Sequence, residues 1–499
     1  MFTVSPETIK YADALAVEKY GISELTLMKT AASECYNAIC ERICKSDKIV
    51  ILCGKGNNGG DGYELSGIFS SFGFDVTVIN FFDCEPNTET AKTVYRDAIA
   101  KSVRFVSFSD WKETLTHADV IIDALFGVGF YGKIEKNSEI GRMIDFCNSL
   151  SAKRIAIDTP SGINSKDGRA EGLVFTADFT VTMAYIKTGM LSYPARDFCG
   201  EIIVADIGYP FELCEEIPKD AFVADDEYLK TVIPKRKPNT HKGSYGRLLM
   251  YCGCETMTGA AILAASAALR TGAGLVNIAR DRKTLKILQN HLIEPIFSPI
   301  DEGNECKDVL CLSDKASAIL IGCGMGNAQC DKEVLYSLIK NANCNIIIDA
   351  DGINLLCENK LILKEAKKTP ILTPHPLEFA RLIGKTASEV QSDRINLAKD
   401  FAKEYGVIVV LKGANTLIAS PDGRLAINTS GNPGLSKGGS GDVLAGFISS
   451  FSCQGLSAFD SAVLGVYLHG KSADLLAGEI GEYGLLPSDL PLAAAKLLP

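Results

Sequence analysis

Residues Asn432–Gly446 read NPGLSKGGSGDVLAG, and this stretch decides the fold class that we expect for the second half of the chain. Five of its fifteen residues are glycines. The apolar run Val443–Ile448 begins two residues after Gly441 and is expected to open a helix. Glycine tolerates positive φ and leaves backbone N–H groups uncovered. A glycine loop that runs into a helix N-terminus binds anions, because unpaired N–H groups and the positive end of the helix dipole face one point. We therefore expect a phosphate site here.

Asp442 falls in the first turn of this expected helix. A carboxylate beside a bound phosphate indicates phosphoryl transfer, with the carboxylate as general base toward a hydroxyl. The simpler interpretation is an Asp N-cap behind a glycine linker, since Asp is common at that position. The stretch Asn432–Gly446 holds only one proline and two serines, which does not resemble a linker.

Length and composition bound the remaining possibilities. A chain of 499 residues exceeds what one core usually organises, so two domains are expected. The 45 glycines indicate many tight turns between strands and helices. A net charge of −10 argues against nucleic acid as the main partner.

The cysteine spacing and the hydropathy pattern indicate that the protein is cytoplasmic. None of the 17 cysteines forms a C-x-x-C pair or has a histidine at metal-ligand spacing, which favours reduced thiols in a cytoplasmic protein. The first residues lack a basic segment followed by an apolar one, so we expect no signal peptide. No uncharged apolar run of about 18 residues occurs, so no membrane span is expected.

The N-terminal half predicts a doubly wound, Rossmann-like α/β domain. Residues 1–45 have a helical pattern, and the strand-like run Lys48–Cys53 leads into a loop over Gly54–Gly62 and a helix over Tyr63–Phe72. Strand, glycine loop and helix form the first turn of such a sheet, where ligands bind at the carboxyl ends of the strands. The loop is not a clean G-x-G-x-x-G fingerprint and is weak evidence alone.

Three further strands are expected at Val76–Phe81, Val120–Leu125 and Arg154–Ile157, each followed by polar or glycine-rich residues. Because parallel strands end at one edge of a sheet, the polar side chains there should converge. One such loop alone would be a helix cap or a turn. Three loops with acids at matching places favour a site, made of Asn58, Asp61, Asp123, Asp158 and Ser161.

The pattern breaks near residues 215–225, where proline, acids and then bases alternate. We place the domains at 1–215 and 225–499. The basic run Lys235–Lys237 is by default a solvated face, with a phosphate-facing role as the alternative.

A second α/β series follows this break. Strands are expected at Leu248–Cys252, Leu275–Ala279, Ala318–Gly322, Asn345–Asp349, Pro370–Leu372 and Val407–Leu411, with an alanine-rich helix over Gly259–Arg270. Leu417–Ala419 and Leu425–Asn428 flank Asp422-Gly423, which predicts a hairpin. The two halves show no internal repeat.

The N-terminal motifs resemble a known family. GNNGGDG (56–62), DALFGVGFYG (123–132) and DTPSGI (158–163) are similar to the NAD(P)H-hydrate epimerase domain over residues 1 to about 210. The resemblance implies that Asp158 is the acid/base at the nicotinamide ring. It implies a potassium ion held by Asn58, Asp123 and Ser161, whose oxygen ligands suit a hard cation. It also implies a hydrated dinucleotide bound by Asn57, Asn58, Gly59, Gly60, Asp61, Gly127, Val128, Gly129, Phe130, Tyr131, Gly132, Lys133 and Asp158.

The C-terminal motifs resemble the ribokinase-like, ADP-dependent NAD(P)H-hydrate dehydratases. The similar segments are HKGSYGR (241–247), GAAILAASAALRTGAGLV (259–276), IDADGINLL (348–356), TPHPLEFARL (373–382) and LKGANT (411–416). By this resemblance Asp442 is catalytic, and Ala260, Gly324, His375 and Asp442 touch the hydrated cofactor. The residues implied to bind ADP are Lys412, Gly413, Ala414, Asn415, Thr416, Asn432, Pro433, Gly434, Leu435, Ser436, Lys437, Gly438, Gly439, Ser440 and Gly441.

Both resemblances in this order imply a fused repair enzyme for NADH or NADPH hydrated at C6. It would epimerise the two C6 hydrates and dehydrate one of them with ADP and Mg²⁺, giving AMP and phosphate. We expect a cytoplasmic homo-oligomer. Four residues depart from the family pattern: Leu377 replaces a usual Gly, Cys323 a Pro, Cys254 a Ser and Met257 a Tyr.

Two alternatives come from other classes. A ribokinase-type small-molecule kinase would keep its phosphorylated product, whereas a dehydratase releases inorganic phosphate. The N-terminal domain could instead be a binding module without catalysis, since sheets of this type host unrelated functions. The group Asn58, Asp123, Asp158 and Ser161 speaks against a bare scaffold.

Overall fold

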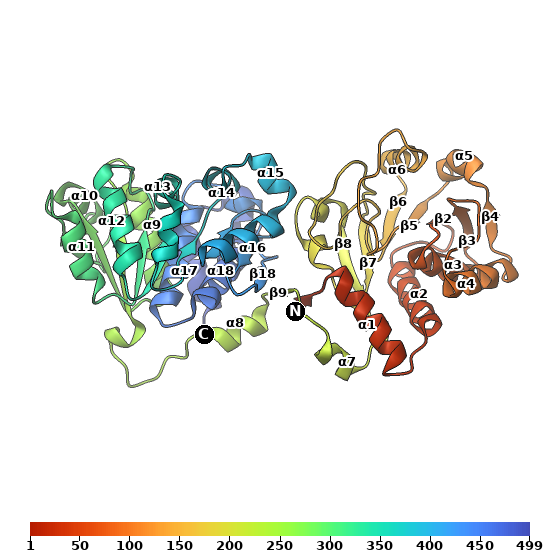
Figure 1. The fold of residues 1–499 in the computed structure, drawn as a ribbon, viewed down its shortest axis with the longest axis horizontal. Coiled ribbons are helices and arrows are strands. Elements are labelled where there is room, and N and C mark those ends of the chain that lie inside the picture. The colour runs from red at the N-terminus through yellow and green to blue at the C-terminus, as the bar shows by residue number, and fades with distance from the viewer. The chain divides into compact units, whose positions relative to one another are not determined.

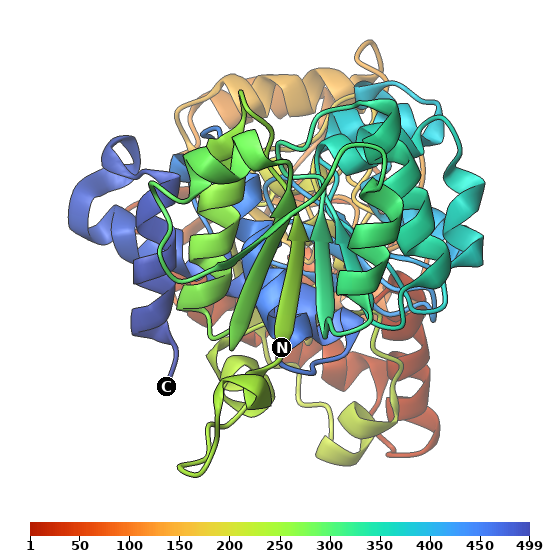
Figure 2. The ribbon, with the colours of Figure 1, turned by 90° about the vertical axis from the view of Figure 1, so that its left-hand side faces the viewer.

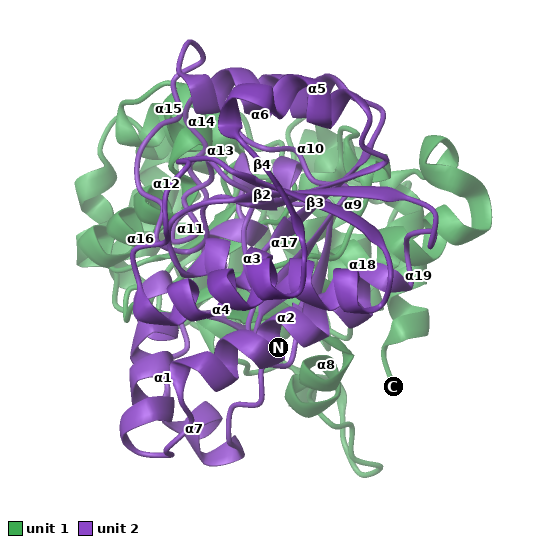
Figure 3. Ribbon diagram, turned by 90° about the vertical axis from the view of Figure 1, so that its right-hand side faces the viewer, with its two compact units in different colours: residues 1, 222–499 green, residues 2–221 purple.

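Two separate, mainly parallel sheets organise the chain, which a computed structural model describes from residue 1 to residue 499 (Figure 1). One sheet belongs to the unit Phe2–Ala221, and the other to Phe222–Pro499, which also includes Met1 (Figure 3). The expected α/β class is confirmed for both. None of the helices combines the length and the apolar character needed to cross a bilayer.

The N-terminal unit is a doubly wound sheet. Its seven strands run in the order β4-β3-β2-β5-β6-β7-β8, and every neighbouring pair is parallel. The strands are β2 (Lys48–Cys53), β3 (Asp75–Asn80), β4 (Arg104–Val106), β5 (Val120–Ala124), β6 (Lys153–Ile157), β7 (Phe179–Met183) and β8 (Glu201–Ala205), preceded by the short β1 (Phe2–Thr3). The helices are α1 (Pro6–Glu18), α2 (Glu24–Cys40), α3 (Asn57–Ser71), α4 (Glu89–Ala100), α5 (Trp111–Thr116), α6 (Glu139–Ser149) and α7 (Phe211–Glu216).

Both faces of this sheet are covered, which explains its continuous apolar strands. Successive side chains of β2 point to opposite faces, so Ile49 and Ile51 pack in one core cluster while Val50 and Leu52 pack in the other. Helices α2, α3 and α4 cover the first face, and α5 and α6 cover the second (Figure 1).

The glycine motif after β2 differs from its prediction. Helix α3 begins at Asn57, so most of the expected loop Gly54–Gly62 is the first turns of a helix. A Cβ at Gly59 would lie 2.0 Å from the carbonyl oxygen of Gly54, and one at Gly62 would lie 2.7 Å from the Ala124 methyl. These glycines therefore allow the helix to approach the sheet closely and do not supply positive φ.

The sheet of the C-terminal unit runs β9-β18-β17-β16-β15-β14-β13-β10-β11-β12. The strands are β9 (Ala221–Val223), β10 (Arg247–Tyr251), β11 (Leu275–Arg280), β12 (Ile296–Pro299), β13 (Ala318–Ile321), β14 (Asn345–Ile348), β15 (Ile371–Leu372), β16 (Ile408–Leu411), β17 (Leu417–Ala419) and β18 (Leu425–Ile427). Strands β10 to β16 pair in parallel, whereas β16, β17 and β18 form an antiparallel ribbon that confirms the expected hairpin. Figure 2 shows the parallel strands side by side, flanked by helices.

The helices of this unit are α8 (Asp226–Val232), α9 (Thr258–Arg270), α10 (Arg282–Leu288), α11 (Glu305–Ser313), α12 (Gln329–Asn341), α13 (Asp351–Leu356), α14 (Pro376–Ile383), α15 (Ala387–Ser392), α16 (Arg394–Tyr405), α17 (Ser440–Cys453), α18 (Ala458–Gly484) and α19 (Leu490–Leu497). Helices α9 and α17 pack closely, because a Cβ at Gly446 would lie 2.4 Å from the carbonyl oxygen of Ala264. Among the glycines of Asn432–Gly446 only Gly439 has positive φ, at 102°. The remaining four serve close approach or leave the backbone uncovered.

Candidate active sites

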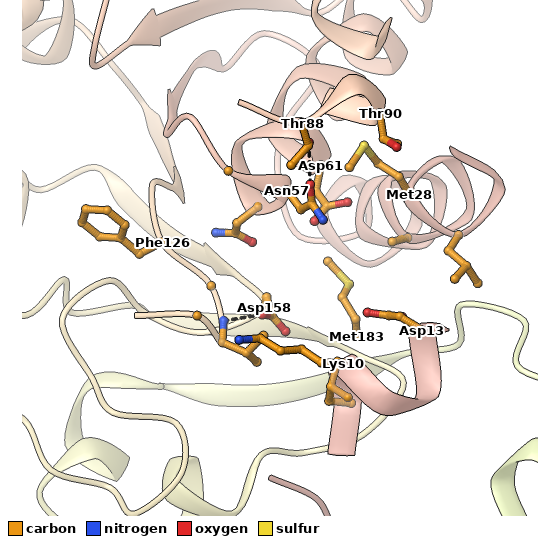
Figure 4. Close-up of a pocket in the computed structure, with 18 of the residues that line it drawn as sticks. Lys10, Asp13, Met28, Asn57, Asp61, Thr88, Thr90, Phe126, Asp158 and Met183 are labelled. Atoms are coloured by element: carbon orange, nitrogen blue, oxygen red, sulfur yellow. Dashed lines mark hydrogen bonds between the residues drawn. The ribbon is translucent and has the colours of Figure 1, made fainter. Parts of the chain in front are cut away.

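The N-terminal unit has a cavity of about 640 Å³ where the strand order reverses around β2 and β5 (Figure 4). This reversal is the place where doubly wound sheets bind ligands. Nine of the expected residues line it, namely Asn57, Asn58, Asp61, Gly127, Val128, Gly129, Phe130, Tyr131 and Asp158. Gly59, Gly60, Gly132 and Lys133 are not among the lining residues. Met28 and Met183 add an apolar wall that suits a flat ring.

Asp158 follows β6 with a φ of 69°, a strained backbone for a residue other than glycine. Its Oδ2 accepts a hydrogen bond of 3.0 Å from the N–H of Val128, and its Oδ1 lies 2.5 Å from Nζ of Lys187. Lys187 is fully buried and also donates to Thr182 Oγ1 and to the carbonyl oxygen of Met183. The expected acid/base is thus half of a buried ion pair, and its lysine has no sequence motif that could have indicated it.

Asp123 and Ser161 are hydrogen-bonded to each other next to the cavity, where they also accept hydrogen bonds from the N–H groups of the lining residues Leu125 and Phe126. The Ser161 hydroxyl donates to Asp123 Oδ1 at 2.7 Å, and its backbone N–H donates to Oδ2 at 2.7 Å. Burial raises the pKa of Asp123 to about 6. Both amide atoms of Asn58 are buried without a partner. The unused amide oxygen of Asn58, the buried carboxylate of Asp123 and the hydroxyl of Ser161 are each of the kind of ligand that suits a hard cation such as K⁺.

Three further acids face the same cavity. Asp13 of α1 accepts a hydrogen bond of 2.6 Å from the hydroxyl of Tyr209, and Glu24 of α2 accepts one of 3.0 Å from the hydroxyl of Thr90. Asp61 of α3 is half-buried, and its carboxyl has no hydrogen-bond or ion-pair partner in the structure. Figure 4 shows Asp13, Asp61 and Asp158 projecting toward one space from three different elements. Asp13 and Tyr209 carry no recognisable local motif, so the sequence did not indicate them.

In the C-terminal unit, three polar residues directly follow the neighbouring strands β14, β15 and β16, and Asp349 contacts the other two. Its Oδ1 lies 2.9 Å from Nζ of Lys412, after β16, and accepts a hydrogen bond of 2.6 Å from Thr373 Oγ1, after β15. The next residue, Ala350, has a φ of 47°, so strained backbone again adjoins a strand-end carboxylate. Asp349 belongs to the motif IDADG, but no role was expected for it.

Asp442 lies in the first turn of α17, as expected. Single ligand atoms of Asp442, Asp349 and Cys323 all lie within 4.8 Å of one another. Burial raises the pKa of Asp442 to about 6, and the neighbouring charge of Asp349 acts in the same direction. Gly441 lies above this group, since a Cβ there would be 3.3 Å from Nζ of Lys412. The glycine loop, Lys412 and two carboxylates therefore share one place.

Buried anchors hold the two expected nucleotide loops. The Arg394 guanidinium donates to the carbonyl oxygens of Leu411 and Lys412, at 3.2 and 3.4 Å, and lies against Gly413. In the second loop, Asn432 donates to Asp474 Oδ1 at 3.0 Å. Nζ of Lys437 is bound by the carbonyl oxygens of Tyr483 and Leu485, so this lysine secures its loop and does not extend toward a ligand.

Of the residues expected to touch the substrate in the C-terminal unit, Ala260 and Gly324 lie side by side, whereas His375 is held at the start of α14. Gly324 and Ala260 are neighbours, with a Cβ at Gly324 2.9 Å from the Ala260 methyl. His375 caps α14, where its Nδ1 accepts from the N–H groups of Leu377 and Glu378 at 3.1 and 3.3 Å. Its other nitrogen, Nε2, lies 3.4 Å from Glu378 Oε1. Leu377 is half exposed, so its side chain is accommodated without displacing the cap.

Two α/β units, each with carboxylates gathered at the carboxyl ends of parallel strands, define an enzyme with two sites. Residues 24–189 match the family described as YjeF-related protein N-terminus, and residues 248–494 match the NAD(P)H-hydrate dehydratase family. The bifunctional NAD(P)H-hydrate repair enzyme of Moorella thermoacetica is 34% identical over 98% of this chain and 95% of its own length. That of Escherichia coli is 33% identical, over 97% and 93%.

Two solved structures resemble the C-terminal unit. The ADP/ATP-dependent NAD(P)H-hydrate dehydratase of Bacillus subtilis, co-crystallised with ATP and Mg²⁺, is 30% identical with a TM-score of 0.49 and covers 56% of this chain and 98% of its own. A ribokinase-like superfamily protein of Enterococcus faecalis is 26% identical with a TM-score of 0.48, covering 56% and 95%.

The chain belongs to the bifunctional NAD(P)H-hydrate repair enzymes. It therefore epimerises hydrated NADH or NADPH and dehydrates it back to the intact cofactor. This membership decides between the alternatives that the sequence left open, because it assigns a reaction to both units.

Proposed function

We propose that Asp442 is the general base of the dehydratase, acting on the C6 hydroxyl of the hydrated nicotinamide ring. The observation that carries this assignment is the convergence of Asp442, Asp349 and Lys412 beneath Gly441 at the start of α17. The helix N-terminus attracts phosphate. A base with a pKa raised to about 6 is ionised at neutral pH yet accepts a proton more readily than an ordinary Asp.

The proposed dehydration consumes one nucleotide for each molecule of hydrated cofactor. Asp442 takes the proton of the C6 hydroxyl, and the oxygen attacks the terminal phosphorus of the nucleotide while the bond to the bridging oxygen breaks. The C6–O bond then breaks with loss of a proton from C5, which restores the C5=C6 double bond and releases phosphate. Phosphate leaves far more readily than hydroxide, so the nucleotide drives the elimination.

The surrounding residues position the terminal phosphate. The N–H groups of Gly439 and Gly441 at the start of α17 would bind it, whereas the N–H of Ser440 already donates to the carbonyl oxygen of Lys437. Lys412 offers a positive charge. The carboxylate of Asp349 is of the kind that Mg²⁺ takes alongside phosphate oxygens and water, whereas the Cys323 thiol is not, and Asp442 acts as the base only when no metal binds it. When bound, Mg²⁺ supplies positive charge that offsets the charge of the transferring group.

The nucleotide is proposed to be ADP, with AMP and phosphate as products. The support is the resemblance to ADP-dependent dehydratases and the B. subtilis relative, described as dependent on ADP or ATP. A ³¹P spectrum of the full-length protein with substrate should show AMP and phosphate formed from ADP. Turnover with ATP and none with ADP would overturn the assignment.

In the N-terminal unit, we assign Asp158 as the base that opens the ring at C6, so that either epimer can form. Its location at the cavity and its fixed orientation support this role. Asn58, Asp123 and Ser161 would hold K⁺, which would supply a positive charge beneath the 123–128 turn. We further propose that the protein acts in the cytoplasm and that it is a homo-oligomer. Light scattering of the purified chain tests the oligomeric state.

Asp442→Asn tests the dehydratase assignment, because it keeps the shape of the side chain and removes the base. We expect dehydration to fall roughly 10²–10⁴-fold while ADP binding by calorimetry is retained. The matched control is Asp301→Asn at a carboxylate that is 67% exposed, which should leave both unchanged. Dehydration at the wild-type rate in Asp442→Asn would remove Asp442 from the mechanism.

A further inference from the structure

Four carboxyls line the N-terminal cavity, and they differ in their partners. Asp158 is bound by Lys187 and by the N–H of Val128, Asp13 by the hydroxyl of Tyr209, and Glu24 by the hydroxyl of Thr90. Asp61 alone has no partner, although it lines the cavity and projects into it from α3 (Figure 4). An unpartnered, half-buried carboxyl is unfavourable unless a ligand uses it. The mechanism above gives it no task.

Epimerisation at C6 itself requires a second proton carrier. The hydroxyl lies on one face of the ring in one epimer and on the opposite face in the other. A carboxylate fixed on one wall reaches the hydroxyl of only one epimer, because proton transfer needs hydrogen-bond distance. Asp158 lies at the end of β6 and Asp61 on α3, so the two belong to different walls of the cavity.

We propose that Asp61 is the second proton-transfer residue of epimerisation, serving the face of C6 that Asp158 does not reach; this rests on the base role proposed for Asp158. Asp158 removes the O6 proton, the C6–N1 bond breaks, and its electron pair moves onto N1 and into the conjugated carboxamide. Rotation about C5–C6 turns the other face of the aldehyde toward N1. The N1 pair re-forms the bond, and O6 takes a proton from the Asp61 carboxyl.

One turnover thus moves a proton from Asp61 to Asp158, and the reverse reaction or exchange with water restores the starting state. No oxidant or further reactant is needed. The electrostatic surroundings agree with this division of roles. Burial raises the pKa of Asp61 well above its usual range, with the charges of Asp158 and Asp13 acting in the same direction and that of Lys187 opposing them. A protonated Asp61 and an ion-paired Asp158 are the two states that the reaction needs.

Asp13 is the competing candidate, and the structure disfavours it. Its Oδ1 accepts the short hydrogen bond from Tyr209, which orients the carboxyl away from free proton exchange. Asp13→Asn is therefore the matched variant for Asp61→Asn, since both remove a carboxyl from the same cavity. The charged and titratable groups that act most strongly on Asp61 or on its neighbours are Asp13 from α1, Cys35 from α2, Asp158 after β6, and Lys187. The same cavity is also lined by Lys10, Glu24, Lys55, Tyr131 and Tyr209.

The experiment uses full-length protein without nucleotide, so that the dehydratase cannot consume substrate. Each single epimer is supplied in turn, and its conversion is followed by chromatography after subtraction of the spontaneous rate. We expect Asp61→Asn to lower kcat roughly 10²–10⁴-fold with KM near the wild-type value, and Asp158→Asn to do likewise. Asp13→Asn, which also lines the cavity, should change KM more than kcat, and the exposed Asp97→Asn should leave both unchanged. The wild-type rate should fall at alkaline pH as Asp61 ionises, and the residual rate of Asp61→Asn should lack that decline.

The outcomes separate the two claims. Loss in Asp158→Asn with wild-type kcat in Asp61→Asn overturns the role of Asp61 and leaves the proposed function standing. A raised KM with unchanged kcat in Asp61→Asn makes it a binding residue only, and also overturns the inference. Loss in Asp13→Asn with retention in Asp61→Asn transfers the role to Asp13. Full activity in Asp158→Asn overturns the proposed function itself.

Discussion

Nζ of Lys187 lies 2.5 Å from Oδ1 of Asp158, and the lysine is fully buried while the carboxylate is nearly so. Lys187 satisfies its other donors on Thr182 and on the carbonyl of Met183. The pair therefore fixes the carboxylate that faces the epimerase cavity. Neither charge has another partner of opposite sign. Loss of Lys187 should therefore affect both the stability of the N-terminal unit and the carboxylate that is proposed to act in epimerisation.

Lys187→Met should destabilise the N-terminal unit by roughly 3–5 kcal/mol, since it leaves a buried carboxylate without its cation. The chain has a single tryptophan, Trp111, in this unit. Urea unfolding followed by tryptophan fluorescence therefore reports the affected unit. Lys29→Met is the control, because Lys29 and Asp97 form a pair with both side chains more than 40% exposed and should contribute less than about 1 kcal/mol. Equal midpoints for the two variants would show that the buried pair does not stabilise the unit.

Arg394→Lys should weaken nucleotide use and leave epimerisation unchanged. A lysine cannot hold the carbonyl oxygens of Leu411 and Lys412 with the fixed fork of a guanidinium, so the loop Lys412–Thr416 loses the support at its start. We expect the KM for ADP to rise by about tenfold, equivalent to about 1.4 kcal/mol, with a smaller change in kcat. An unchanged KM for ADP would remove Arg394 from the positioning of this loop.

The dehydratase should lose activity as the pH falls through about 6. Burial and the charge of Asp349 raise the pKa of Asp442 to about 6, and the base must be ionised to act. The rate should therefore be full above this pKa and fall about tenfold per pH unit below it. The profile of kcat/KM for dehydration between pH 5 and 8 measures this, with circular dichroism at each pH to confirm folding. A flat profile down to pH 5 contradicts the assignment.

His469 should make the C-terminal unit less stable in acid. Burial lowers the pKa of His469 to about 4, from 6.5 in an exposed histidine. Between these values the unfolded chain binds a proton that the folded chain does not, so stability falls as the pH drops from 6.5 toward 4, by up to about 3 kcal/mol. Urea unfolding by circular dichroism at pH 7 and pH 5 should show a smaller difference in His469→Gln than in the wild type. An equal difference in both would exclude His469 as the cause.

The sequence predicted much of the fold because its strongest signals are local. Buried parallel strands such as Lys48–Cys53 are continuous apolar runs. It did not predict β7 and β8, which lie in the segment between the DTPSG motif and the domain break. The glycine motifs were located correctly but explained incompletely, since Gly62 and Gly446 permit close packing with partners that are distant in sequence, Ala124 and Ala264.

The candidate site residues also fall into those that the sequence indicates and those that only the tertiary fold reveals. Asp442, Asp158 and Asn58 adjoin glycine loops and could be found from their motifs. Lys187 and Asp13 could not, because each is brought to the cavity only by the tertiary fold and has no motif of its own. Arg394 likewise lies in an ordinary amphipathic helix, and only its contacts with the strand end identify it.

The central claim is that two separate sites complete one repair, each handling C6 with its own carboxylate. Chromatography of an epimeric mixture of the hydrates, incubated with ADP and protein, tests it most directly. Asp158→Asn should consume one epimer rapidly and the other slowly, whereas Asp442→Asn should interconvert the epimers without removing either. Removal of both epimers by Asp158→Asn as fast as by the wild type, with spontaneous epimerisation shown to be slower than the assay, would contradict the account.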